Sequence, residues 1–280
     1  MLAENDGGLA ANLLNCTLVC PTISSGDLSA HLSYTHLMTT MFISDLHLNA
    51  AQPEVIAQAL DFLRTEARRA EHLYILGDLF EFWIGDDDTD PAYLRVQDEL
   101  RALTASGVPC SVMHGNRDFL IGKQFERRTG CKLIADSTVI CLYGEQVLLL
   151  HGDTLCTDDR SYQRLRRIVR NPIVQWIFRL FPLTRRERIA AKIRMGSQRH
   201  TQKAAAMIMD VNAQVVESTF DRAHVATMIH GHTHRPAIHQ HHLSNGATGT
   251  RIVLGDWHTQ GSVLRWSADN GYALVSLPRT

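Results

Sequence analysis

Five short polar motifs, each placed directly after a run of apolar residues, constrain the fold of this 280-residue chain most strongly. The motifs are Asp45-Leu46-His47, Gly77-Asp78, Gly115-Asn116-Arg117-Asp118, His151-Gly152-Asp153 and Gly231-His232-Thr233-His234. The apolar runs have the length of short buried strands. Side chains that follow strands of an α/β sheet gather at one edge, where ligands bind. The pattern therefore predicts an α/β fold with one polar site at the strand ends.

The expected secondary structure alternates between strands and helices. Strands are expected at 41–44, 73–76 and 110–113, and later at 225–229, 252–254, 263–266 and 273–276. Apolar residues recur with a helical period after Pro53 and over 92–104. The segments 139–142 and 147–150 are typical of a hairpin. His239, His241 and His242 follow no strand, and we expect them on a surface loop.

The N-terminal segment 1–37 contains no Lys or Arg and no sustained periodicity. We expect a poorly ordered extension. Met38 is the expected natural start, and a genuine flexible tail is the alternative. The apolar stretch 9–20 lacks the preceding basic residues of a secretory signal peptide, and no apolar run approaches the length that spans a membrane.

Composition excludes several classes of protein. The 28 Lys+Arg and 29 Asp+Glu nearly cancel, so the overall charge does not indicate a nucleic-acid partner. The six cysteines form no C-x-x-C pair, which argues against a zinc ribbon or a thioredoxin-like centre. Scattered cysteines in a chain of this length are typical of a reducing compartment, and we expect a cytoplasmic protein.

The segment 155–203 has a different character from the rest of the chain. It carries thirteen Lys and Arg against three acidic residues, interleaved with Ile, Val, Trp, Phe and Leu. We expect a helical, basic and apolar insertion over about 155–215. It forms either a helical hairpin with a solvated basic face, or a lid that binds anionic and partly apolar ligands such as lipid headgroups.

The motifs offer seven oxygen or nitrogen ligands and no sulfur. These are Asp45, His47, Asp78, Asn116, His151, His232 and His234. Seven donors are too many for one tetrahedral zinc ion, but they suit two ions of intermediate hardness that share a carboxylate, such as manganese, iron or zinc. Two metals about 3.5–4 Å apart can clamp a phosphoryl group and deprotonate a bridging water. The predicted reaction is hydrolysis of a phosphate ester or anhydride.

Together the five motifs resemble those of the calcineurin-like metallophosphoesterases. The resemblance implies a four-layer α-β-β-α sandwich with a two-metal site. The first metal would be held by Asp45, His47, Asp78 and His234, and the second by Asp78, Asn116, His151 and His232. Arg117 stands where many members have a histidine assigned as a general acid. A guanidinium there would instead neutralise and orient phosphate.

Longer stretches around the motifs resemble one family closely, the UDP-2,3-diacylglucosamine diphosphatases of lipid A synthesis in Gram-negative bacteria. The stretches are 42–48, 75–81, 83–87, 114–120, 151–159 and 230–236, and the resemblance covers about 38–280. It implies two Mn²⁺ ions and attack of water on the α-phosphorus of UDP-2,3-diacylglucosamine. The products would be UMP and 2,3-diacylglucosamine 1-phosphate.

The same resemblance implies the functional residues. Catalysis would depend on Asp78, Asn116, Arg117 and His232. Substrate contacts would fall on Asn116, Arg117, Asp159, Ser197, Thr201, Lys203 and His232, with Ala204 standing where a lysine is expected. Asp118 and Asp153 are expected to orient metal ligands. The acidic run 86–88 is expected to be a solvated loop or a helix cap.

A substrate with acyl chains and a diphosphate suits an insertion rich in both apolar and basic residues. We therefore expect a monomer that associates peripherally with the cytoplasmic face of the inner membrane and binds no nucleic acid. One alternative is a manganese-dependent phosphodiesterase or phosphatase for a soluble substrate, which would not need the apolar insertion. Another is a non-catalytic membrane-binding scaffold, which should lack several of the seven ligands.

Overall fold

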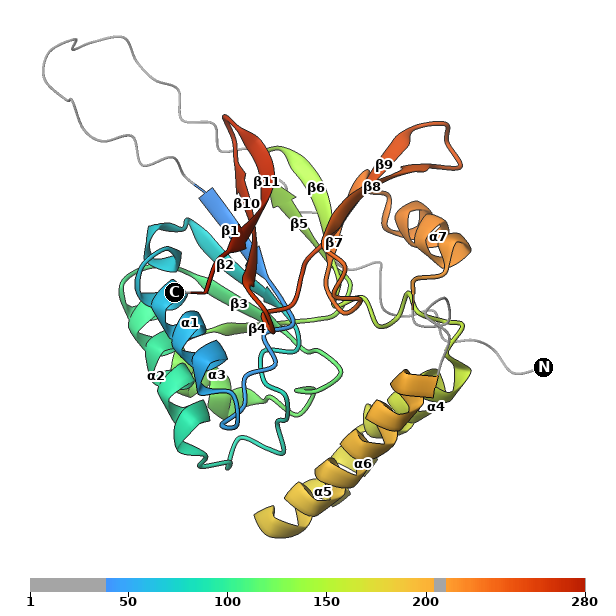
Figure 1. Cartoon of the computed structure of the whole chain (residues 1–280). Coiled ribbons are helices and arrows are strands. Elements are labelled where there is room, and N and C mark those ends of the chain that lie inside the picture. The colour runs from blue at the N-terminus through green and yellow to red at the C-terminus, as the bar shows by residue number, and fades with distance from the viewer. Residues whose placement is uncertain (1–38, 204–209, 280) are drawn as a thin grey trace, which may run out of the picture. The chain divides into compact units, whose positions relative to one another are not determined.

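The structure, a computed structural model, describes residues 39–203 and 210–279, with side chains described at 39–196 and 210–279. The predicted N-terminal extension lies outside the described residues. Two β-sheets form the centre of the described part, as Figure 1 shows, one of six strands and one of five.

The six-stranded sheet has the order β11-β10-β1-β2-β3-β4. Its strands are β1 (Thr39–Ile43), β2 (His72–Leu76), β3 (Cys110–Met113), β4 (Lys132–Ile134), β10 (Gly261–Ser267) and β11 (Gly271–Leu277). Strands β1 to β4 pair in parallel, whereas β10 is antiparallel to both β1 and β11. The parallel strands are linked by α1 (Pro53–Arg64), the short helix η1 (Ala67–Arg69), α2 (Pro91–Ala105) and α3 (Lys123–Thr129).

The five-stranded sheet has the order β5-β6-β7-β9-β8. Its strands are β5 (Thr138–Leu142), β6 (Glu145–Leu149), β7 (Thr227–His230), β8 (Ala237–His242) and β9 (Thr248–Val253), and α7 (Ala213–Ala223) precedes β7. The hairpin of β5 and β6 is antiparallel, as predicted, and β6, β7 and β9 run parallel.

Three apolar clusters separate four layers and confirm the α-β-β-α sandwich. Along β1, Met41 and Ile43 pack with residues of α1 and α2, whereas Phe42 faces the other way into a cluster shared with the five-stranded sheet. Alternation of this kind is what a strand buried on both faces requires. A third cluster joins β6 and β7 to α7, where Val216 and Phe220 are buried.

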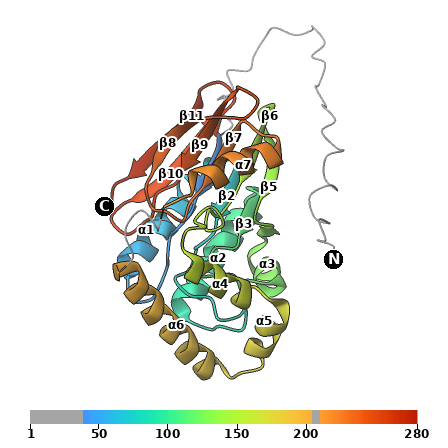
Figure 2. The same cartoon turned by 90° about the vertical axis from the view of Figure 1, so that its right-hand side faces the viewer.

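The segment that follows β6 is helical, as predicted. It comprises α4 (Arg160–Val169), α5 (Pro172–Arg179) and α6 (Leu183–Lys203), which lie together at one end of the sheets in Figures 1 and 2. The buried Arg186 attaches α6 to the loop after β2, because its guanidinium donates to the Ile84 carbonyl oxygen at 2.6 Å and pairs with Asp87. None of the described helices is both long enough and apolar enough to cross a membrane.

Five elements were not predicted: η1, α3, β4, α7 and β8. The expected surface loop at His239, His241 and His242 is wrong, since all three lie in β8. This strand is at the sheet edge and largely exposed, so it lacks the apolar alternation that marks a buried strand. Within 86–88, the helix-cap alternative holds for Asp86, whose carboxylate accepts from the backbone N–H of Gln124 at the start of α3.

Candidate active site

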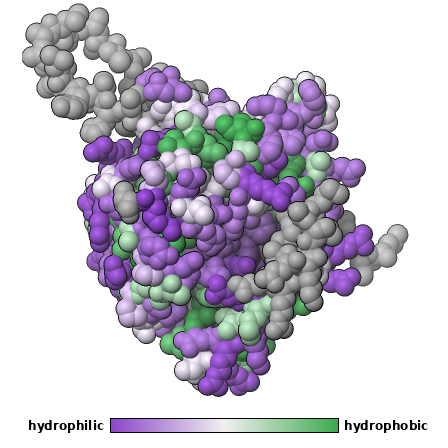
Figure 3. All heavy atoms as spheres, viewed as in Figure 1, coloured by the Kyte–Doolittle hydropathy of each residue, from purple (hydrophilic) through white to green (hydrophobic). Residues whose placement is uncertain are grey.

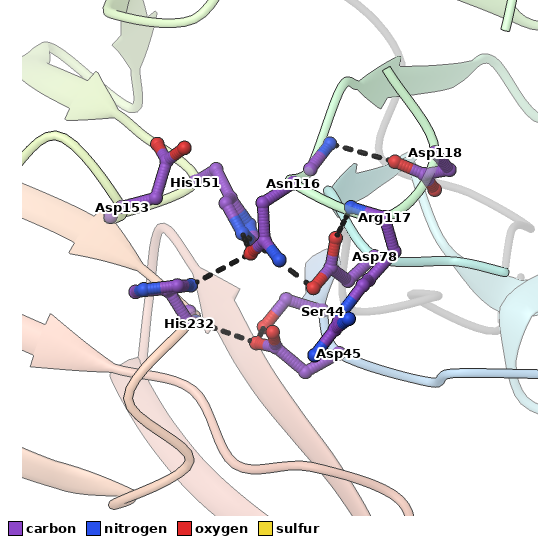
Figure 4. A network of polar contacts seen from close by, with 12 residues as sticks. Ser44, Asp45, Asp78, Asn116, Arg117, Asp118, His151, Asp153 and His232 are labelled. Carbon is purple, nitrogen blue, oxygen red and sulfur yellow. Dashed lines mark hydrogen bonds and ion pairs between the residues drawn. The ribbon is translucent and has the colours of Figure 1, made fainter. Parts of the chain in front are cut away.

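The seven predicted metal ligands converge where the two sheets meet. The six-stranded sheet contributes Asp45 and His47 after β1, Asp78 after β2 and Asn116 after β3. The five-stranded sheet contributes His151 after β6, and His232 and His234 after β7. Figure 4 shows side chains from both sheets pointing into one space. The strand ends therefore bring together residues up to 189 positions apart in the chain.

One half of the site is formed by Asp45, His47, Asp78 and His234. The Nε2 atoms of His47 and His234 lie 3.2 Å apart, and Asp45 Oδ1 is 3.3 Å from His234 Nε2. Asp78 Oδ2 lies 3.7 Å from His47 Nε2. Asp45, His47 and Asp78 are buried, and their ligand atoms all lie within 4.8 Å of one another.

The other half is centred on Asn116. Its Oδ1 atom lies 2.9 Å from both His151 Nε2 and His232 Nδ1. Asp78 Oδ2 is 3.8 Å from His151 Nε2, so this one carboxylate oxygen faces both halves of the site. The arrangement is what a bridging ligand between two neighbouring ions requires.

The donor set fits divalent metal ions on chemical grounds. The buried Asp45 Oδ1 atom lies 3.3 Å from His234 Nε2 and 3.9 Å from His47 Nε2, so it faces the imidazole nitrogens of the same half of the site. Burial disfavours charge on the imidazoles, yet the carboxylates of Asp78 and Asp45 raise the pKa of His151 to about 9. Hydrogen bonds to Asp256 and Asp45 likewise outweigh burial and raise the pKa of His234 to about 10. Burial and the neighbouring His151 instead lower the pKa of His232 to about 4. The carboxylates thus stabilise positive charge at His151 and His234, where metal ions would also bring it.

Three of these imidazoles are oriented by groups that contact their Nδ1 atoms, on the side of the ring away from the site. The Nδ1 atom of His151 donates to the Leu76 carbonyl oxygen at 2.9 Å, which leaves Nε2 free to bind a metal. His47 Nδ1 lies 2.8 Å from Glu81 Oε2, and His234 Nδ1 lies 3.3 Å from Asp256 Oδ2. Such partners hold the ring orientation and the tautomer of a metal ligand.

The two aspartates that were expected to orient metal ligands act on the surrounding framework. Asp118 accepts from the backbone N–H groups of Leu79 and Gly115, both at 2.8 Å, and so joins the loops that carry Asp78 and Asn116. Asp153 Oδ2 accepts from Tyr162 Oη and Arg166 Nε, both at 2.6 Å, and so joins the loop of His151 to α4.

The loops that carry the ligands hold unusual backbone conformations. Five of the seven ligands have a positive φ: Asp45 (55°), His47 (50°), Asp78 (51°), His232 (68°) and His234 (56°). Non-glycine residues adopt this conformation only at a cost, and such residues concentrate at functional sites. Close contacts add a second constraint, because a Cβ on Gly115 would lie 2.0 Å from Asp78 Oδ1.

A cavity of about 330 Å³ leads away from the site. Asn116, Arg117 and Tyr162 line it near the ligands. Elsewhere its walls are mostly apolar side chains of the loop after β2 and of α4, α5 and α6. These include Phe82, Trp83, Leu165, Ile168, Val174, Phe178, Ile189 and Ile193. The cavity therefore joins a polar end, beside the candidate metal ligands, to a mostly apolar interior.

Comparison with known proteins agrees with this geometry. The model of the calcineurin-like phosphoesterase family matches residues 38–236. The chain belongs to the calcineurin-like phosphoesterase family. Two relatives of this phosphoesterase are both named UDP-2,3-diacylglucosamine hydrolase. The protein of Serratia proteamaculans is 53% identical over 86% of this chain and 100% of its own length, and that of Edwardsiella ictaluri is 52% identical over 86% and 93%.

Among solved structures, an archaeal phosphodiesterase aligns with 86% of this phosphoesterase and 100% of its own chain. The two are 13% identical with a TM-score of 0.43, a likeness too remote to bear on activity.

The remaining predicted substrate residues stay predictions. Asp159 is buried and caps α4, where its carboxylate accepts from Tyr162 N at 2.9 Å. The side chains of Ser197, Thr201 and Lys203 lie outside the described part of the phosphoesterase. Sequence reasoning missed Asp256, although it follows β9 and so carries the same strand-end signal as the ligands. It also missed Tyr162 and Arg166, which lie on a helix and carry no such signal.

Proposed function

We propose that this phosphoesterase hydrolyses the diphosphate of UDP-2,3-diacylglucosamine, releasing UMP and 2,3-diacylglucosamine 1-phosphate in lipid A synthesis. The observation that carries the proposal is a cavity that begins at Asn116 and Arg117, beside the cluster of candidate metal ligands, and continues between apolar side chains. A nucleotide with acyl chains needs both parts. Relatives at about 50% identity that bear the name of this activity support the same substrate.

The proposed site holds two Mn²⁺ ions. Asp45, His47, Asp78 and His234 would hold one, and Asp78, Asn116, His151 and His232 the other, with Asp78 shared. When bound, the ions supply positive charge to the phosphoryl oxygens and lower the pKa of a coordinated water. The donors present, with Asp45 Oδ1 facing the imidazole nitrogens of His47 and His234, support this assignment.

Arg117 is the proposed contact for the diphosphate. Its backbone N–H donates to Asp78 Oδ1 at 2.8 Å, which fixes the residue beside the bridging carboxylate. Its Nε atom is buried and makes no hydrogen bond to the described residues, and the residue lines the cavity. A guanidinium so placed can donate to phosphate oxygens and stabilise charge that develops there, together with His232. The apolar wall around it limits access of bulk water.

The proposal is tested with purified protein and UDP-2,3-diacylglucosamine in detergent, with Mn²⁺ or with EDTA. The expected result is release of UMP only with metal, and loss of release in Asp78→Asn. Bis-p-nitrophenyl phosphate serves as a small diester control. If that diester is cleaved and the lipid is not, the two-metal chemistry stands and a soluble substrate replaces the proposed one. If neither is cleaved and no metal binds, the scaffold alternative replaces the enzyme.

We also propose that α5 rests on the cytoplasmic face of the inner membrane as part of a lid, with the protein a monomer. Ile173, Trp176, Ile177 and Leu180 share one helical face, and their exposed fractions are 65%, 61%, 45% and 64%. In Figure 3, hydrophobic atoms lie among hydrophilic ones at the lower end, where Figure 1 places α5. An exposed apolar face flanked by Arg residues suits an anionic bilayer surface.

Membrane binding is measured by co-sedimentation with phosphatidylglycerol vesicles. Trp176→Ser should weaken sedimentation, whereas Ile238→Ser, which changes an exposed apolar residue of β8, should not. Equal binding of both variants would contradict the assignment to α5. Equal binding to phosphatidylcholine vesicles would contradict the part assigned to the flanking Arg residues.

A further inference from the structure

A line of charged groups connects the wall of the cavity to one of the metal ligands. Glu81 lies between the two, in the loop after β2, and is 7% exposed. Its Oε2 atom is 2.8 Å from His47 Nδ1, and its Oε1 atom is 3.2 Å from Arg194 Nε. Arg194 belongs to α6, and its guanidinium lies 5.0 Å from the centre of the Phe82 ring.

Glu81 is the partner that orients His47. Its two carboxylate oxygens are divided between two partners, Oε2 facing His47 Nδ1 and Oε1 facing Arg194 Nε. An ionised carboxylate at Nδ1 favours the tautomer in which Nε2 carries no proton and is free to bind a metal. Nε2 is the atom that faces Asp45, Asp78 and His234.

Arg194 is the second partner of this buried carboxylate. A buried ion pair that loses one member leaves an uncompensated charge, and the carboxylate of Glu81 would then turn toward another partner or toward solvent. That reorientation would remove the support of His47. The position of Arg194 depends in turn on α6, which Arg186 attaches to the loop that also carries Glu81. Arg194 also lines the cavity.

We propose that Glu81 and Arg194 are a positioning pair that links the α6 wall of the cavity to the metal ligand His47. The inference rests on the proposed function only in so far as His47 binds a metal ion. Arg194 would then do more than line the cavity, because it would also hold Glu81 against His47.

The test is a double-mutant cycle read out by Mn²⁺ affinity, measured by calorimetric titration of the metal-free protein. Glu81→Gln should weaken binding of one Mn²⁺ ion by about tenfold, within the range for residues that orient metal ligands. Arg194→Ala should weaken the same ion, and adding it to Glu81→Gln should cause little further loss. Arg194→Lys keeps the charge and should recover most of the affinity. Lys192→Ala, an exposed cation on the same helix, is the matched control and should bind Mn²⁺ normally.

Additive losses in the double variant would overturn the proposal, because Arg194 would then act independently of Glu81. So would an Arg194→Ala protein with normal Mn²⁺ affinity that differs only in KM for the lipid substrate, since that identifies Arg194 as cavity wall alone. Neither the titration nor hydrolysis of bis-p-nitrophenyl phosphate needs the lipid. Failure to hydrolyse UDP-2,3-diacylglucosamine would therefore refute only the proposed substrate. Non-additive losses of Mn²⁺ affinity in the Glu81 and Arg194 variants would still support the positioning pair.

Discussion

Replacing Gly115 by alanine should disable the site without a change in any polar group. The added Cβ would lie 2.0 Å from Asp78 Oδ1 and 2.2 Å from the Asp78 backbone nitrogen, whereas ordinary van der Waals contact begins at 3.4 Å. Because one of the clashing atoms is backbone, rotation of the Asp78 side chain cannot relieve the contact. The loop must therefore retreat by more than an ångström.

A displacement of about 1 Å in a catalytic group typically costs about 100-fold in rate, or about 2.7 kcal/mol of barrier. We expect at least that loss in kcat for Gly115→Ala, together with weaker Mn²⁺ binding, because Asp78 is the proposed bridging ligand. The assay is Mn²⁺-dependent hydrolysis of bis-p-nitrophenyl phosphate, with circular dichroism to confirm folding. Gly196→Ala is the matched control, because nothing lies within 4 Å of its added Cβ. Wild-type activity in a folded Gly115→Ala protein would refute the reasoning.

Three further predictions concern charged residues of the site. Asp78→Asn should abolish turnover because the bridge between the two halves loses its charge; measurable kcat at saturating Mn²⁺ would contradict this. Arg117→Ala should raise KM and lower kcat with metal content intact, and loss of both ions by elemental analysis would exclude its assignment to substrate. Arg166→Ala removes the cation that pairs with the buried Asp153, and it should lower the free energy of unfolding, measured with urea, by about 2–4 kcal/mol. An unchanged midpoint would show that Asp153 needs no such partner.

The order of elements and the position of the site follow from the sequence because both depend on local patterns. A short apolar run predicts a buried strand, and an Asp, Asn or His directly after it predicts a residue of the site, as at Asp45 and Asp78. The helical character of 160–203 is also local, since apolar and basic residues alternate there with a helical period.

What could not be predicted depends on contacts between distant parts of the chain. Strand β8 is polar and becomes a strand only because β9 pairs with it. Glu81 looks like one more acidic residue until the fold brings His47 and Arg194 to its two oxygens. Tyr162 and Arg166 likewise acquire a partner only when α4 meets the loop of Asp153.

The pairing of the late strand β10 with the early strand β1 determines when this sheet can be completed during synthesis. The strand that leads into Asp45 pairs on one side with β10, and Thr39 lies opposite Ser267. The backbone N–H of Trp257 also reaches the Asp45 carbonyl oxygen, at 3.3 Å. More than 200 residues must therefore leave the ribosome before the first ligand strand is covered on both edges. At about 5–20 residues per second, β1 stays an open edge for ten seconds or more of roughly steady translation, a long interval in which a chaperone can act.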